Sequence, residues 1–177
     1  TMWKTQAKKL IKEFEGLRLK SYKCPGGYNT IGYGHVINNA TEDSLFNNGI
    51  NEAEAETILL KDITLANQAL MRLVRVPLNE HQRTALVSFV FNVGSGAFQA
   101  STLRQKLNRF EYELAAEQFS RWIHGGGRIL PGLVRRRKAE MAVFLRKDKP
   151  IVQTQQNTIK APSFWQQVTV YFDFARN

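Results

Sequence analysis

Residues 14–35 decide the fold: they read Phe-Glu-Gly-Leu-Arg-Leu-Lys-Ser-Tyr-Lys-Cys-Pro-Gly-Gly-Tyr-Asn-Thr-Ile-Gly-Tyr-Gly-His. A carboxylate, Glu15, stands just before a glycine that can stop a helix. The lone cysteine, Cys24, follows in a turn, and Thr30 follows on a glycine-spaced strand. A helix end joined in this way to a β-hairpin can aim three polar side chains at one point. Such geometry suits bond cleavage with an acid on one side and a water-orienting pair on the other.

The sequence around this stretch predicts a helix, a strand, a turn and a second strand. Apolar residues at helical spacing predict an amphipathic helix of about three turns that ends at Gly16; they are Ala7, Leu10, Ile11 and Phe14. Residues 17–22 alternate as a half-buried strand does, and residues 25–27 are a turn signal. Residues 29–36 alternate again and predict one continuous strand. Its glycines leave one face bare, so that a ligand or another backbone can approach closely.

The rest of the chain predicts helices. Asn51 with Glu54, and Asn79 with Gln82, have the spacing of capping boxes, so helices should begin after each asparagine. The first should run to about Val74, and the second should be central because its apolar stripe is wide. Further helices are expected at 101–108, 111–123 and 133–146, with a mobile loop at 124–128. These elements predict a mostly helical α+β protein.

Composition restricts the class of protein. The chain has 177 residues, of which 43% are hydrophobic, enough for one domain or two lobes sharing a core. A single cysteine excludes an internal disulfide, so the fold must rest on its hydrophobic core. The formal charge of +10 favours polyanionic partners, whether nucleic acid, anionic lipid or an acidic envelope polymer. Neither a secretory signal nor an apolar stretch long enough to span a membrane is present.

Each member of the opening triplet also has an ordinary structural interpretation. A glutamate at a helix end is usually solvated, a lone cysteine is usually a small buried hydrophobe, and threonine is common in strands. The positions argue for chemistry, because Glu15 faces the hairpin and Cys24 occupies a turn that offers little burial. Burial favours the protonated form of a carboxyl group, which would let Glu15 protonate a leaving-group oxygen.

Other chemistries lack support. The three histidines, His35, His81 and His124, do not have the spacing of metal ligands, so neither a metal nor another cofactor is expected. The sequence contains no phosphate-binding loop and no nucleophile elbow. His35 is expected to pair with a carboxylate, for which Asp62 is one candidate. The basic run 135–138 is either a solvated face or the source of an arginine that turns inward to pair with Glu15.

The chain resembles the phage-type lysozymes of bacteriophage endolysins, glycoside hydrolase family 24. The match consists of Glu15, eight residues, Cys24, five residues and Thr30, followed by Ile-Gly-Tyr-Gly-His. Further matches are Phe-Asn-Val-Gly at 91–94, Ser-Thr-Leu at 101–103, Trp122, and Gly-Leu-Val-Arg-Arg-Arg-Lys-Ala-Glu at 132–140. The resemblance covers about residues 6–146, and its specificity lies in the combination of motifs in order.

The resemblance implies a lysozyme-like catalytic domain over residues 1–146. A small lobe at about 15–60 would carry the hairpin. The larger helical lobe would comprise about 75–146 and the N-terminal helix, and a long helix would join the two. The implied reaction is hydrolysis of the β-1,4 bond between N-acetylmuramic acid and N-acetylglucosamine in peptidoglycan. Peptidoglycan is then the partner, nucleic acid is not expected, and the enzyme should be a monomer.

The resemblance also implies residue roles. Glu15 would be the general acid, while Cys24, where many relatives have aspartate, would position the attacking water with Thr30. Inversion is the family expectation. Because this residue is a cysteine, three roles stay open for its sulfur: it could position the water, act as a base, or attack the sugar directly. By position, His35 and Asp62 would be a structural pair near the hinge. Arg136, or Arg137 after a one-residue shift, would contact the catalytic glutamate. Cleft residues would be Asn92, Ser101 and Thr102.

Two alternatives to a muramidase stay open at this point. A lytic transglycosylase would use the glutamate without a water-positioning pair, and a cationic binder would not need the Glu-Cys-Thr spacing at all. The extension 147–177 lies outside the resemblance; we expect its aromatic residues to pack on the core, with membrane contact as the alternative. Without a signal segment the protein should accumulate in the host cytoplasm until a holin-like lesion releases it, unless an upstream anchor precedes this sequence.

Overall fold

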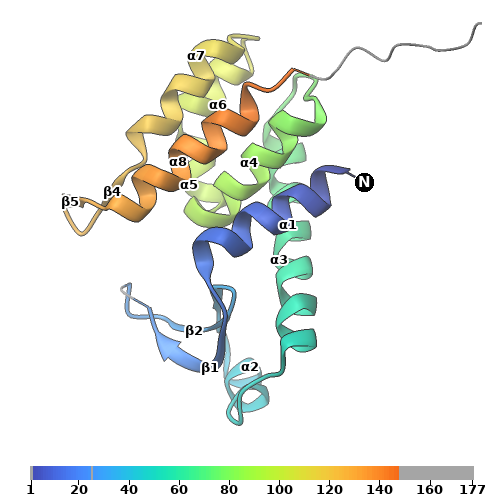
Figure 1. Ribbon diagram of the computed structural model, residues 1–177, viewed down its shortest axis with the longest axis vertical. Helices are drawn as coiled ribbons and strands as arrows, with labels where there is room; N and C mark the ends of the chain where they lie inside the picture. Colours follow the sequence, from blue (N-terminus) through green and yellow to red (C-terminus); the bar gives the residue numbers. More distant parts are fainter. Residues whose placement is uncertain (1, 25, 148–177) are drawn as a thin grey trace, which may run out of the picture.

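The computed structural model describes residues 2–24 and 26–147, which form two lobes joined by a long helix (Figure 1). Helix α3 (Glu52–Leu73) runs between the lobes. The strands and the short helix formed by residues 18–45 lie at one end, and the remaining helices lie at the other end with a short hairpin. The fold is therefore the mostly helical α+β architecture that the sequence predicts. The predicted C-terminal extension lies, beyond Lys147, outside the described residues, as does Pro25 of the predicted turn.

The small lobe begins where the first helix ends. Helix α1 (Met2–Glu15) stops at Gly16, whose φ of 67° is the left-handed conformation expected of a helix-terminating glycine. Strands β1 (Arg18–Lys23), β2 (Asn29–Gly32) and β3 (His35–Val36) then form an antiparallel sheet in the order β1-β2-β3. Helix α2 (Ala40–Leu45) follows, and Asn39 caps it through the Glu42 backbone N–H.

The strand predicted over residues 29–36 is wrong as a continuous element. A turn at Tyr33 and Gly34 divides it into β2 and β3, which pair with each other in antiparallel register. Gly32 and Gly34 have φ of 64° and 87°, values that glycine adopts without strain, and these angles reverse the chain. The glycines thus make a turn where a bare strand face was expected.

Both predicted capping boxes are confirmed. Asn51 caps α3 and Asn79 caps α4 (Glu80–Val93). In each box the asparagine side chain accepts a hydrogen bond from the backbone N–H of the residue three positions later. The side chain of that later residue accepts a hydrogen bond from the backbone N–H of the asparagine. Each box satisfies two donors that a helix start leaves unpaired. Shorter helices complete the large lobe: α5 (Ser95–Ala100), α6 (Thr102–Leu107), α7 (Tyr112–Glu117), the 3-10 turn η1 (Gln118–Arg121) and α8 (Pro131–Phe144).

The loop predicted at 124–128 is a short hairpin instead. Strands β4 (His124–Gly125) and β5 (Arg128–Ile129) pair antiparallel around Gly126 and Gly127, both of which have positive φ. Two glycines between pairing residues are a strong hairpin signal, which explains why the chain is ordered there. The hairpin leads directly into α8.

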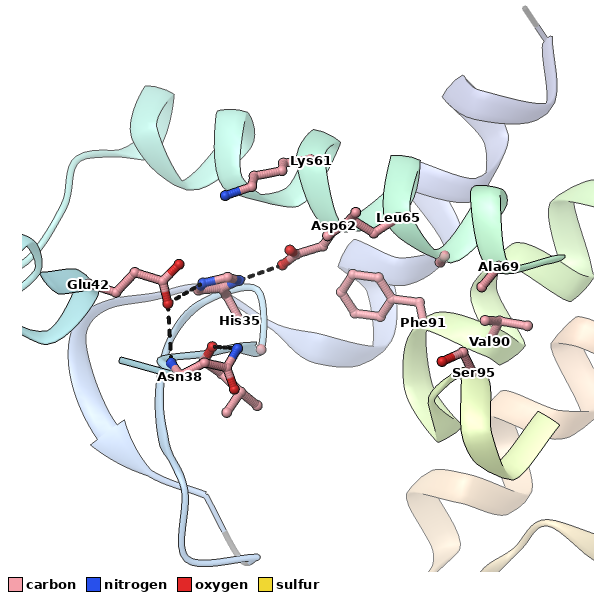
Figure 2. A pocket seen from close by; sticks show the side chains of 13 residues that line it. His35, Asn38, Glu42, Lys61, Asp62, Leu65, Ala69, Val90, Phe91 and Ser95 are labelled. Carbon is pink, nitrogen blue, oxygen red and sulfur yellow. Dashed lines mark hydrogen bonds and ion pairs between the residues drawn. The ribbon is translucent and has the colours of Figure 1, made fainter. Parts of the chain in front are cut away.

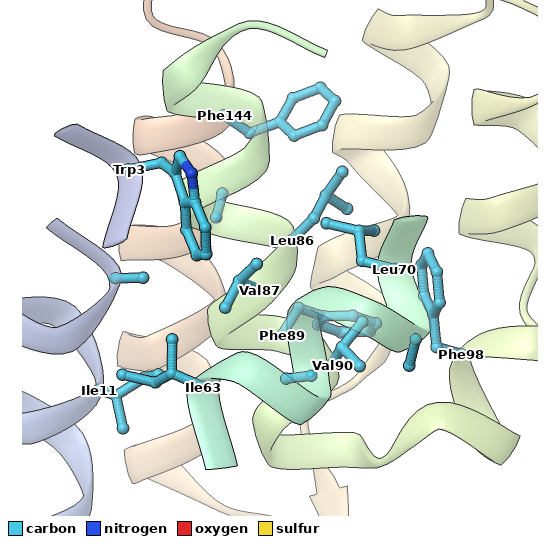
Figure 3. Close-up of a cluster of buried hydrophobic side chains, with 14 of the residues drawn as sticks. Trp3, Ile11, Ile63, Leu70, Leu86, Val87, Phe89, Val90, Phe98 and Phe144 are labelled. Atoms are coloured by element: carbon cyan, nitrogen blue, oxygen red, sulfur yellow. The ribbon is translucent and has the colours of Figure 1, made fainter. Parts of the chain in front are cut away.

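The central helix of the core is α4, as its wide apolar stripe predicts. Every residue from Thr84 to Val90 is buried, and α4 packs against α1, α3 and α8. Figure 3 shows side chains from α1, α3, α5 and α8 converging on it, among them Ile11, Ile63, Phe98 and Phe144. Because α1 and α8 both rest on α4, the end of α1 and the face of α8 lie at fixed positions relative to each other.

Candidate active site

Glu15 is the last residue of α1 and points toward α8. Its carboxyl oxygen Oε1 lies 2.5 Å from Nη1 of Arg136, and the Glu15 side chain is 21% exposed. Arg136 comes from the predicted basic helix, and its side chain is only 3% exposed. Of the two interpretations of the basic run, the inward-turning arginine is therefore the one that the structure shows.

Arg136 is itself held by buried groups. Its Nε donates to Oε1 of Glu140 at 3.1 Å, and its Nη2 donates to the backbone carbonyl of Ser88 at 3.2 Å. The Ser88 hydroxyl donates to the same Glu140 oxygen at 2.7 Å. Glu140 is completely buried, and an uncompensated charge there would be costly. The guanidinium that faces Glu15 is thus fixed by two contacts, one to Glu140 on α8 and one to the Ser88 carbonyl on α4.

The second oxygen of the Glu15 carboxyl group faces the small lobe. A Cβ atom built on Gly34 would lie 3.2 Å from Oε2 of Glu15, and φ at Gly34 is 87°. Glycine is therefore needed here both for the backbone conformation and for the close approach of the carboxyl group. One oxygen of Glu15 is bound to the helical lobe and the other lies against the β2–β3 turn.

Thr30 lies on β2, and Cys24 lies in the turn directly after β1. Tyr22 pairs with Thr30 across β1 and β2, so their side chains share a face, and Cys24, two residues after Tyr22, continues it. The turn is closed by backbone hydrogen bonds from Cys24 N to Tyr28 O, 2.9 Å, and from Gly27 N to Cys24 O, 2.8 Å. These bonds hold the thiol and the hydroxyl side by side.

Tyr22 is influenced by the charges of both Cys24 and Glu15. Burial raises the pKa of Tyr22, and the negative charges of Glu15 and Cys24 raise it further. The phenol therefore lies within electrostatic reach of both groups. The structure thereby places Glu15, Cys24 and Thr30 around one region at the junction of the lobes. Tyr22 is a member of this region that the sequence analysis did not single out.

The Cys24 thiol is activated by its neighbours. A hydrogen bond with the Thr30 hydroxyl is the main cause that lowers the pKa of Cys24, and backbone contacts around Tyr28 add to it. The Thr30 hydroxyl also donates to Tyr28 O at 3.1 Å. Because a hydroxyl has one proton, donation to the thiolate must replace the bond to Tyr28. Ionisation of the thiol is therefore coupled to rotation of the hydroxyl.

Glu15 lines one cavity, and the glycine next to its carboxyl group, Gly34, lines a second. One, of about 630 Å³, is lined by Glu15 and Arg136 together with Asn92 and the start of α8. The other, of about 380 Å³, lies between the lobes and is lined by Gly34, which contacts Glu15, and by residues of α3 and α4 (Figure 2). The carboxyl group of Glu15 is therefore accessible from the first of these cavities, close to the seam of the lobes.

The inter-lobe cavity is bordered by a charged cluster that ties β3 to α3. His35 Nδ1 lies 2.8 Å from Asp62 Oδ2, and His35 Nε2 lies 3.7 Å from Glu42 Oε2 on α2 (Figure 2). The Asp62 carboxylate raises the pKa of His35 by hydrogen bonding to its protonated ring. The sequence named Asp62 as one candidate partner, and the structure brings the two together at the seam of the lobes.

The three residues expected in the cleft are not gathered in one place. Asn92 lines the cavity that contains Glu15, and its Oδ1 accepts from Arg137. Ser101 and Thr102 line a separate cavity of about 450 Å³ beside Trp122. Ser101 is buried, and its hydroxyl caps α6 by accepting from Arg104 N and donates to Phe98 O. Its polar atoms are thus committed to the fold, whereas Thr102 is exposed.

Sequence reasoning missed Glu140 and Ser88, the buried groups that hold Arg136. The four-residue spacing of Arg136 and Glu140 on one helix was a signal for such a pair. Within residues 2–24 and 26–147, no cluster of three or more His, Cys, Asp or Glu side chains is placed to hold a metal ion. The chemistry available at this site is that of a carboxyl group, a thiol, a hydroxyl and a buried guanidinium.

An α+β fold with a carboxyl group at the junction of a small sheet lobe and a helical lobe defines the lysozyme class of protein. The sequence profile described as Phage lysozyme matches residues 12–140. The chain belongs to this family. It is 42% identical over 139 residues to an endolysin of Acyrthosiphon pisum secondary endosymbiont phage 1, covering 76% of this chain and 92% of that relative.

Two further comparisons agree. An endolysin of Bacillus phage B103 is 41% identical over 138 residues, 77% of this chain, and the chain spans about half (51%) of that longer relative. Among solved structures, the muramidase domain of SpmX from Asticaccaulis excentricus is similar with a TM-score of 0.68 and 33% identity, over 80% of this chain and 95% of that one. As a member of the phage lysozyme family, the protein is a glycoside hydrolase that degrades peptidoglycan.

Proposed function

We propose that this lysozyme hydrolyses the β-1,4 bond between N-acetylmuramic acid and N-acetylglucosamine, with Glu15 as the general acid. The observation that carries this assignment is the division of the carboxyl group between the lobes. Oε1 is bound by Arg136, while Oε2 faces Gly34 and is free to carry the proton. Once the proton passes to the leaving-group oxygen, the carboxylate that remains is stabilised by the buried guanidinium.

We propose further that Cys24 and Thr30 position the attacking water on the opposite side of the sugar. Thr30 lies on β2 and Cys24 directly follows the paired strand β1, and hydrogen bonding from Thr30 to the ionised thiol lowers the pKa of Cys24. A thiolate accepts a hydrogen bond from water, and the Thr30 oxygen supplies a second acceptor. Attack by this water would invert the anomeric centre.

The stereochemistry separates this route from direct attack by sulfur. Proton NMR of the first-formed product should show the α anomer if water attacks directly. An initial β anomer would instead mean that a covalent sulfur intermediate forms and is then hydrolysed. Quantitative alkylation of Cys24 should strongly reduce activity in either case, so a fully active alkylated enzyme would remove Cys24 from the mechanism.

The general-acid role is tested with Glu15→Gln. The amide keeps the size of the side chain but cannot donate a proton of comparable acidity, so clearing of permeabilised Gram-negative cells should slow by a factor of about 10²–10⁴. Glu117→Gln, an exposed change in the helical lobe with the same loss of charge, should clear cells at the wild-type rate. Equal clearing by both variants would overturn the assignment.

Family membership favours hydrolysis over the two alternatives. A lytic transglycosylase would leave an anhydro sugar, which the product mass would reveal, and a cationic binder would not lose its effect in Glu15→Gln. Such a binder would act on the anionic envelope through its basic surface, without cleaving it.

We propose a catalytic domain over residues 1–146 that acts as a monomer, with no bound nucleic acid and no cofactor. The described helices include none that is both long and apolar enough to cross a membrane. Action on the cell wall follows from family membership, and accumulation in the host cytoplasm before a holin-like lesion is our proposal for the earlier stage. Size-exclusion chromatography with light scattering tests the monomer, since a dimer would have about twice the mass.

A further inference from the structure

The amide of Asn92 faces the cavity that contains Glu15. Asn92 is next to the last residue of α4, is exposed, and lines the 630 Å³ cavity together with Glu15 and Arg136. A side-chain amide has an oxygen that accepts and a nitrogen that donates. Which of the two faces the cavity decides what kind of atom Asn92 can bind there.

Arg137 determines this orientation. Its Nη2 donates to Oδ1 of Asn92. A guanidinium has donors only, so the amide oxygen must face Arg137, and the reverse orientation would set two donors against each other. The Asn92 nitrogen is thereby directed away from Arg137, and no residue in the described part of the chain accepts a hydrogen bond from it.

Arg137 is well suited to hold this orientation because it is fixed itself. Its side chain is 1% exposed, its Nη1 lies 2.7 Å from Oε2 of Glu140, and its guanidinium lies over the Phe89 ring at 4.8 Å. Burial lowers the pKa of Arg137 to about 10, so the group still carries its charge at neutral pH. Arg137 is therefore a buried, charged group that donates to one exposed amide.

We infer that Arg137 is a positioning residue, which holds the Asn92 amide so that its NH₂ group donates to a neutral acceptor oxygen of the bound sugar beside Glu15. The inference rests on the proposed function, because it assumes that the glycan occupies the cavity. Arg136 and Arg137, which are adjacent on α8, then have different roles. One holds the carboxyl group of Glu15, and the other orients the donor next to it.

The sharpest test is Asn92→Asp. The aspartate keeps an oxygen for Arg137 and nearly the same shape, but it presents an acceptor to the sugar where the amide presented a donor. On soluble uncrosslinked peptidoglycan strands, kcat/KM should fall about tenfold or more, with an unfolding temperature equal to or above the wild type. A kcat/KM within twofold of wild type would overturn the inference.

A double-mutant cycle tests whether Arg137 acts through Asn92. Arg137→Lys keeps the buried charge beside Glu140 but loses the second donor arm, so kcat/KM should fall about fivefold in the wild-type background. In the Asn92→Ala background the same change should cost less than twofold, because no amide is left to orient. An equal loss in both backgrounds would show that Arg137 only stabilises the fold, and the inference would be wrong.

Glu15→Gln in the same assay separates this inference from the proposed function. If Glu15→Gln abolishes cleavage while Asn92→Asp is fully active, the general-acid assignment stands and the positioning role of Arg137 fails. If Glu15→Gln cleaves normally, the proposed function itself fails.

Discussion

The two lobes fix their reactive groups in different ways. In the helical lobe, the carboxyl group of Glu15 meets a guanidinium that is held by a buried carboxylate, Glu140, and by α4. In the small lobe, Cys24 and Thr30 are held mainly by backbone hydrogen bonds of a short turn and by strand pairing. A carboxylate beside a buried guanidinium is stabilised by charge that water does not screen, whereas the thiol and the hydroxyl of the small lobe depend on the backbone geometry of their turn and strand.

The largest effect on stability should come from the buried ion cluster of the helical lobe. Glu140→Ala leaves Arg136 and Arg137 buried without their shared carboxylate, which should lower the free energy of unfolding by about 3–5 kcal/mol. Urea denaturation measures this change. The exposed Glu117→Ala should stay within about 0.5 kcal/mol of wild type. A small loss in Glu140→Ala would mean that the helical lobe does not depend on its ions.

The contact between the lobes is tested at Gly34. Alanine there must adopt a φ of 87°, at a cost of about 1–2 kcal/mol, and its methyl group would crowd Oε2 of Glu15. We expect Gly34→Ala to lose activity beyond its loss of stability, because the carboxyl group is displaced. Gly127→Ala in the β4–β5 hairpin is the matched control: Gly127 has a φ of 75° and nothing within 4 Å of the added carbon. If both variants lose activity equally, crowding of Glu15 is not the cause.

The seam between the lobes should depend on pH through His35. The pKa of His35 is raised in the folded state, so its protonated ring stabilises the fold below the usual histidine pKa of about 6.5. This contribution, about 1–2 kcal/mol for a charged hydrogen bond, is lost as pH rises through the raised pKa. Denaturation from pH 6 to pH 9 should show the decline in wild type. Asp62→Asn should flatten it, and an equal slope in that variant would contradict the assignment.

The smallest effect should be seen at the thiol of the small lobe. Thr30→Val removes the hydroxyl that lowers the pKa of Cys24, so less thiolate is present at pH 7. The rate of alkylation by iodoacetamide should fall a few-fold, and its pH midpoint should move upward. An unchanged midpoint would show that the backbone of the turn, rather than Thr30, sets the ionisation of Cys24.

The sequence was most informative where a feature depends on neighbours along the chain. The caps at Asn51 and Asn79 and the helix stop at Gly16 are local, and the structure has all three. Local signals were also present where the prediction failed. Asn39 with Glu42 has capping spacing for α2, and Gly126-Gly127 is a hairpin turn.

The buried contacts of the site could not be predicted from sequence patterns within single segments. Glu140 and Ser88 meet because α4 and α8 pack together, and no pattern within either segment specifies that pairing. The inward turn of Arg136 was foreseen only as one of two alternatives. The orientation of Asn92 by Arg137 depends on the rotation of α8 about its axis, which the run of three arginines leaves undetermined.

The ion pair between Glu15 and Arg136 also sets an order of events during synthesis. The two residues are 121 positions apart, and the carboxylate leaves the ribosome long before its partner. At about 5–20 residues per second, the wait is roughly 6–24 s. Until α8 has been synthesised and has packed on α4, the Glu15 carboxylate of the nascent chain lacks the Arg136 guanidinium as its partner. A chain truncated before Pro131 would therefore lack α8 and the arginine that pairs with Glu15, so we expect it to be inactive.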